Sequence, residues 1–111
     1  MNFGNVKWTP SEKKIARAAF DAALESALAG IMAELKSRAS AATAFSEVWE
    51  IEDYLRQQRK EIDETFDYRY SQLPFVFACL IRQGHLDESL LAGLSEEKRE
   101  IIRSFLRFSA S

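Results

Sequence analysis

Proline and glycine, the residues that most often interrupt helices, are scarce in this chain, with two Pro and four Gly among 111 residues. So few turn-forming residues favour a small number of long elements over many short strands. The length corresponds to one domain, and a domain of this size buries only about two-thirds of the surface of its unfolded chain. We therefore expect a modest core, part of which a second copy of the chain completes.

Cysteine and histidine each occur once, as Cys79 and His85. A single cysteine cannot form a disulfide within the chain, which is typical of a reducing cytosol. Cys79 lies in an apolar segment and is expected to be a buried, inert thiol. Without a second histidine there is no convincing transition-metal site, and His85 is expected at a helix end. Because phosphate-binding glycine motifs and nucleophile elbows are missing as well, we predict no cofactor and no enzymatic activity.

Excess charge and long apolar runs are missing too. The net charge of -2 offers no basic surface to a phosphate backbone, which argues against nucleic-acid binding. The longest nearly apolar run, residues 73–81, is about half as long as a membrane span requires. Residues 1–8 form a short tail without the apolar segment of a secretory signal. We expect a cytoplasmic protein that does not insert into membranes.

A first long helix is predicted from a capping box. Thr9 can cap it, Pro10 suits its first position, and Glu12 completes the box. The helix should end near Arg38, and Gly30 within it should allow a neighbour to approach closely. One apolar stripe follows a helical spacing, over Leu24, Leu28, Ile31 and Leu35.

A second long helix is predicted after a reversal at residues 37–43, over about residues 43–70. Its apolar side chains also recur at helical spacing, at Val48, Ile51, Leu55, Ile62 and Phe66. Such a helix extends for about 40 Å, which is more than one small globule covers. We therefore predict a long antiparallel helical hairpin, the stem, that pairs with a second hairpin in a homodimer.

The remaining residues are predicted to form a small helical head. Residues 71–83 are apolar almost all round; a strand is the competing interpretation, but Gly84 stands where a helix C-cap belongs. Asp87 can cap a short turn over residues 88–93, and Ser95 opens a last helix. The fold class is thus all-α, with a stem at residues 1–70 and a head at 71–111 packed as one structural unit.

Trp49 is a large aromatic residue that lies off the apolar stripe of the second helix. Charged side chains of both signs share its side of that helix: Glu52, Asp53, Arg56, Arg59 and Asp63. Trp and Arg are enriched at interface hot spots, so one interpretation is a recognition patch. The other is that Trp49 packs on the first helix or on a second subunit, beside an ordinary ion-paired surface. An anion-binding enzyme built on the arginines is disfavoured, because the surrounding acids would neutralise its pocket.

A family resemblance covers nearly the whole chain as an ordered set of short segments. The segments are Trp8, Glu12 and Phe20; Gly-Ile-Met-Ala at 30–33; Trp-Glu-Ile-Glu-Asp-Tyr-Leu at 49–55; Arg-Lys-Glu-Ile-Asp at 59–63; Phe-Asp-Tyr-Arg at 66–69; Phe-Val-Phe-Ala at 75–78; and Gly84. Together they resemble the cyanobacterial fluorescence recovery proteins. The resemblance implies an all-α homodimer that binds the photoactivated orange carotenoid protein, mainly through its C-terminal domain. It further implies faster return to the resting orange form, which ends the quenching of phycobilisome fluorescence.

The resemblance also assigns residues. It places the working patch on Trp49, Asp53 and Arg59, dimer contacts on Met32 and Val48, and a head-domain contact on Phe75. Glu52 completes the predicted partner-binding set, and Ile31 and Leu55 of the apolar stripes complete the predicted dimer interface. Two positions depart from the family pattern: Glu52 stands where His is usual, and Ile101 where Lys is expected. The alternative is therefore a dimeric protein of the same fold that binds a different protein partner.

Overall fold

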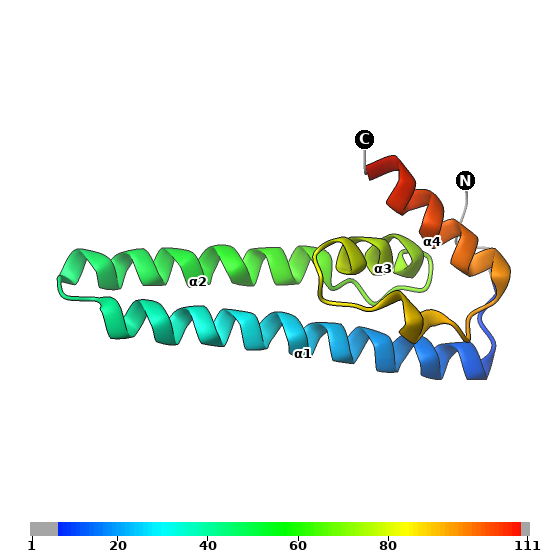
Figure 1. The fold of residues 1–111 in the computed structure, drawn as a ribbon, viewed down its shortest axis with the longest axis horizontal. Helices are drawn as coiled ribbons and strands as arrows, with labels where there is room; N and C mark the ends of the chain where they lie inside the picture. Colours follow the sequence, from blue (N-terminus) through cyan, green and yellow to red (C-terminus); the bar gives the residue numbers. More distant parts are fainter. Residues whose placement is uncertain (1–6, 110–111) are drawn as a thin grey trace.

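The computed structural model describes residues 7–109, and over this range the chain forms helices and no strand. Four α-helices and one 3-10 helix follow in the order α1 Pro10–Ala41, α2 Phe45–Thr65, α3 Leu73–Arg82, η2 Glu88–Leu91 and α4 Glu96–Ser109. The molecule measures 53 × 28 × 20 Å, and α1 and α2 run antiparallel with α3, η2 and α4 gathered at one end (Figure 1). The predicted all-α class with an elongated stem and a head is confirmed, whereas the homodimer stays a prediction.

The predicted capping box opens α1. The Thr9 hydroxyl accepts a hydrogen bond from the Glu12 amide, and the Glu12 carboxylate accepts one from the Thr9 amide, both at 3.1 Å. The helix continues to Ala41, three residues beyond its predicted end at Arg38, because residues 39–41 are Ala-Ser-Ala and alanine favours helix. After the reversal, the Glu47 carboxylate accepts from the Thr43 amide at 3.2 Å, which ties the first turn of α2 to the residue before its N-cap.

The predicted extension of the second helix to Tyr70 is wrong, because α2 ends at Thr65. Phe66 already departs from helical backbone angles, with φ -88° and ψ 74°. In this conformation the Phe66 and Tyr68 rings pack edge-on against Phe20 of α1, at centroid distances of 5.3 and 4.8 Å. The Arg17 guanidinium also lies 4.7 Å from the Tyr68 ring centroid. Aromatic packing across the chain thus outweighs the local preference for helix.

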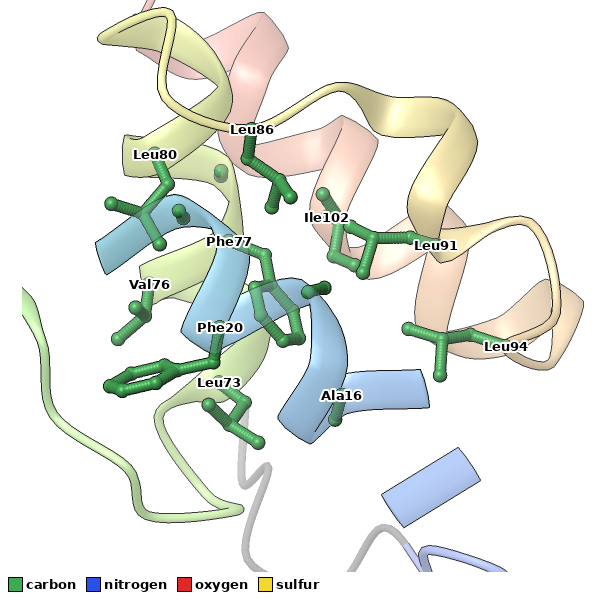
Figure 2. Packing of buried hydrophobic residues seen from close by; sticks show 13 residues of the cluster. Ala16, Phe20, Leu73, Val76, Phe77, Leu80, Leu86, Leu91, Leu94 and Ile102 are labelled. Atoms are coloured by element: carbon green, nitrogen blue, oxygen red, sulfur yellow. The ribbon is translucent and has the colours of Figure 1, made fainter. Parts of the chain in front are cut away.

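The hydrophobic core lies in the head and draws on α1 as well as on residues 71–111. Leu73–Arg82 form the helix α3, so the helix predicted within residues 71–83 is confirmed and the strand alternative is excluded. The side chains of Leu73, Phe77 and Leu80 have no solvent exposure. Small side chains of α1 let α3 pack closely against it; these are Ala16, Ala19 and Ala23. Leu86, Leu91, Leu94 and Ile102 close the core from the other side (Figure 2).

Two predicted caps in the head are confirmed. Gly84 has a φ of +82°, and the amides of Gly84 and His85 donate to the carbonyls of Ile81 and Leu80 at the end of α3. Only glycine adopts this left-handed conformation without strain. The Asp87 carboxylate accepts from the Ser89 amide at 2.9 Å at the start of η2. These local hydrogen bonds therefore end α3 and begin η2, and the chain between them returns toward α1.

A buried ion pair fastens the start of α1 to α4. The Lys98 ammonium lies 3.2 Å from the Glu12 carboxylate, and both side chains are less than a tenth exposed. Glu12 also accepts from the Ser95 amide at 2.9 Å, while Lys98 donates to the Lys7 carbonyl at 2.6 Å. Burial alone would raise the pKa of Glu12, but the Thr9 and Ser95 amides and the Lys98 ammonium lower it to about 2. Glu12 is therefore a charged component of the head at neutral pH.

Trp8 packs against the head, although the sequence predicted that it belongs to a short tail at residues 1–8. Its ring packs against Tyr70 at 5.4 Å and against the Lys98 ammonium at 5.1 Å. The rest of the predicted tail, residues 1–6, lies outside the described residues. The N-terminal aromatic residue therefore covers the buried ion pair and joins the 66–72 segment to the head.

Candidate partner-binding surface

The outward face of α2 presents a large aromatic side chain to solvent. Trp49 is 64% exposed, and no side chain of α2 is classed as buried. The helix begins at Phe45, so Trp49 lies within about two turns of the hairpin tip. Of the two interpretations of Trp49, the structure of a single chain excludes packing against α1. What remains is a recognition patch or a contact with a second copy.

Arg56 forms ion pairs with two acidic residues on the Trp49 side of α2, Glu52 and Asp53. Its guanidinium forms an ion pair with Glu52 one turn earlier and reaches Asp53 at 3.9 Å. All three side chains are at least half exposed, so each pair contributes only a few tenths of a kcal/mol and can rearrange on binding. Glu52 is thus paired with a cation from within the same helix.

Arg59 differs from Arg56 because it makes no ion pair or hydrogen bond within residues 7–109. Its side chain is exposed, one turn beyond Leu55. A planar guanidinium with free donors suits a carboxylate or another acidic group on a partner. The surface therefore combines an exposed indole, two acids that share one guanidinium, and the available cation of Arg59.

The predicted dimer residues are distributed over exposed and half-buried positions. Met32 and Val48 are 54% and 50% exposed, whereas Ile31 and Leu55 are half-buried between the two helices. Leu28, which was expected on the α1 stripe, is 49% exposed beside Met32. Exposed apolar side chains thus lie on both helices of the stem.

These exposed side chains share one face of the hairpin. On α1, Ile31 faces α2, and Leu28 and Met32 are rotated about the helix axis by about 60° and 100° from it. On α2, Val48 is rotated by about 60° from Ile51 in the same sense. Because the helices are antiparallel, equal rotation about each axis, viewed from each N-terminus, leads to the same side. Exposed apolar side chains gathered on one face are typical of a protein interface.

Phe75 lies apart from this face, on α3 in the head. It is 48% exposed, and its ring meets Phe105 of α4 edge-on at 5.4 Å. About 24 Å of α2 separate Trp49 from the end of that helix at Thr65, since each residue adds about 1.5 Å. Within one chain, Phe75 and the Trp49 surface are therefore separate contact points.

The described residues offer few other reactive or metal-binding groups. Cys79 is half-buried, not buried as expected, and it forms no disulfide. Within residues 7–109, no group of three or more His, Cys, Asp or Glu side chains is arranged to hold a metal ion. No described helix is both long and apolar enough to cross a bilayer. The role of Arg56 in bridging Glu52 and Asp53 was not predicted, although its spacing of four and three residues carried the signal.

Comparisons of sequence and structure with known proteins all find the same family. The family model described as "Photoprotection regulator fluorescence recovery protein" matches residues 8–106. The fluorescence recovery protein of Synechocystis sp. PCC 6803 is 33% identical over 100 residues, covering 90% of this chain and 92% of that protein. The solved structure of the Fremyella diplosiphon fluorescence recovery protein superposes with a TM-score of 0.87 at 36% identity, covering 91% and 99% of the two chains. The Synechocystis structure gives the same TM-score and coverage at 33% identity.

Proposed function

This chain belongs to the family of the photoprotection regulator fluorescence recovery protein, and on that basis we propose that it binds the photoactivated orange carotenoid protein. It accelerates the return of that protein to its resting orange form and so ends the quenching of phycobilisome fluorescence. The family match over almost the whole chain supports the partner. The exposed Trp49 and the unpaired Arg59 on α2 support the contact surface.

The proposed mechanism is non-covalent. A protein that binds the arrangement leading back to the resting state shifts the population toward it without any bond being made or broken. Trp49 supplies apolar contact area and Arg59 supplies a cation for an acidic group of the partner. No cofactor is needed for this role, and a cytoplasmic location fits it.

A homodimer is part of the proposal. The exposed apolar face with Leu28, Met32 and Val48 covers both helices of the stem and fits a second copy of the chain. Ile31 and Leu55 lie half-buried next to it and would be covered further. Pairing two hairpins along this face would remove the apolar side chains from water.

The second candidate is a dimeric protein of the same fold with another protein partner. It is favoured by Glu52, because a carboxylate replaces a ring that can donate a hydrogen bond and carry positive charge. The ion pair with Arg56, which also reaches Asp53, partly offsets the charge of that carboxylate in the free protein. If the first candidate is right, the Glu52–Arg56 ion pair must be compatible with binding of the orange carotenoid protein. If the second is right, the pair contributes to the recognition of another partner.

The deciding experiment is a mixing assay. An orange carotenoid protein is photoactivated, the protein is added in the dark, and the absorbance change from red to orange is followed. We expect clear acceleration. No acceleration by a folded helical protein would discard the partner and leave the second candidate.

Substitution of Arg59 tests the surface. We expect R59A to lose most of the acceleration with little change in melting temperature, because Arg59 makes no contact that holds the described fold together. K36A is the matched control, since it removes one exposed cation from α1 and should leave the acceleration unchanged. A large loss of stability in R59A, or equal effects of both variants, would contradict the assignment.

A further inference from the structure

A groove at the junction of stem and head is not used by the proposed partner surface. It lies between α1, α2 and the turn after α3, and has a volume of about 420 Å³. This volume falls in the range of pockets that hold small molecules. Ala27, Ile31, Ile62 and Phe66 supply its apolar wall.

Gly30 opens this groove. The sequence suggested that Gly30 lets a neighbour approach, but a Cβ atom placed there would meet nothing within 4 Å. A glycine inside a helix destabilises it relative to alanine, and no close contact in the structure requires one here. The missing side chain instead leaves space that the groove occupies.

The polar side of the groove favours a cation. Glu61 is the one lining residue with a formal charge at neutral pH when His85 is neutral. Its Oε1 atom accepts from Gln57 at 3.0 Å, while Oε2 accepts no hydrogen bond from the described residues. His85 is placed at the edge with Nδ1 3.4 Å from the Ser26 hydroxyl, which leaves Nε2 available. The Phe66 ring adds aromatic surface, which attracts organic cations, whereas the Tyr54 ring already carries the Arg38 guanidinium 4.2 Å from its centroid.

From this arrangement we propose that the groove binds a small amphipathic organic cation, an apolar body carrying one ammonium or guanidinium group. The charged group pairs with Glu61, and the body packs on Ile31, Ile62 and Phe66. Such a ligand touches α1, α2 and the turn before η2 together, so it joins the stem to the head. This site uses none of the side chains assigned to the carotenoid-protein contact, and it shares Ile31 with the proposed dimer interface.

The groove stays accessible if the stem pairs through its apolar face. Relative to Ile31 and Ile51, Gly30 and Glu61 are rotated by about 100° and 80° in the sense opposite to Met32 and Val48. They therefore lie on the other flank of the line where α1 and α2 meet. A second copy seated on the apolar face leaves this flank open to solvent.

The single histidine makes the test direct. In a titration of the protein with phenethylamine, the imidazole proton signals of His85 report the groove without further assignment, since the chain has one His. We expect a saturable shift with a dissociation constant on the order of 1 mM, as suits a ligand of this size. The uncharged analogue 2-phenylethanol should bind about twofold to fivefold more weakly, because the Glu61 carboxylate is exposed and forms a weak ion pair.

Two variants and one control decide the outcome. G30F should fill the groove and abolish the shift, whereas G30A should keep binding and raise the melting temperature slightly. E61Q, which keeps size and shape, should weaken phenethylamine to the level of 2-phenylethanol. No saturable shift in the unmodified protein, or equal binding of amine and alcohol, would overturn the proposal. Unchanged binding in E61Q would overturn the role of the carboxylate even if G30F did not fold.

Discussion

Protonation of Glu12 should loosen the head in acid. The pKa of this carboxyl falls from 4.5 in the unfolded chain to about 2 in the folded protein. A lowered folded-state pKa stabilises the fold at pH values above the unfolded pKa, and this contribution disappears as the pH falls toward the folded pKa. At about 1.4 kcal/mol per pH unit, the loss amounts to roughly 3 kcal/mol between about pH 5 and pH 2.

Substitution isolates this contribution from those of other carboxyls. The pKa values of Asp67, Asp87 and Glu100 are lowered as well, so the unmodified protein and every variant share their pH dependence. E12Q removes the titrating group and keeps one acceptor oxygen, so its NH2 group faces either the Thr9 or the Ser95 amide and lowers the stability at every pH. The free energy of unfolding should therefore depend less steeply on pH in E12Q than in the unmodified protein.

Urea unfolding followed by circular dichroism at pH 7, 5 and 3 measures the difference. At pH 7, K98M should lose more free energy of unfolding than E12Q, about 3–5 kcal/mol, because it leaves the Glu12 carboxylate buried without its cation. The double variant E12Q/K98M should recover part of that loss. Parallel pH profiles for E12Q and the unmodified protein, or a K98M variant of normal stability, would refute the reasoning.

Three further substitutions test other parts of the molecule. F77A should destabilise the head by about 3–5 kcal/mol in urea unfolding, since Phe77 is fully buried in the core; a loss below 1 kcal/mol would mean that the cavity collapses or that the ring is less buried. G84A should cost about 1 kcal/mol, because its φ of +82° strains any side chain; a neutral effect would show that the turn relaxes easily. M32E should yield monomers by light scattering, since it places a carboxylate in the proposed dimer face, and an unchanged dimer would relocate the interface.

The local features of the fold could be predicted because the interactions behind them span few residues. The capping box of Thr9 and Glu12 joins residues three apart, and Gly84 satisfies carbonyls within the last turn of α3. The apolar character of residues 73–81 predicted a buried helix for the same reason, since nearly every side chain of a helix with no polar face must be covered. The candidate residues on α2 were likewise found from helical spacing and family resemblance.

Exposure and ion pairing at the candidate site needed coordinates. Spacing placed Trp49 and Arg59 off the apolar stripe but could not distinguish a solvated tryptophan from one packed on α1. Nor did it show that Arg56 engages both Glu52 and Asp53 while Arg59 stays unpaired within the described chain. Several acids lie within reach of each arginine, and these surface pairs differ too little in energy for the sequence to rank them.

Sequence alone determined the helix content, the principal caps, and the segment that had to be buried, because hydrogen bonds and periodicity over a few residues decide them. Tertiary structure alone decided where α2 ends, since Phe66 and Tyr68 leave helical geometry to pack on Phe20. It also decided the partnership of Glu12 with Lys98, 86 residues away, and the groove beside Gly30. Such features depend on which distant surfaces meet, and that choice reflects the packing of the whole core, not the preference of any one segment.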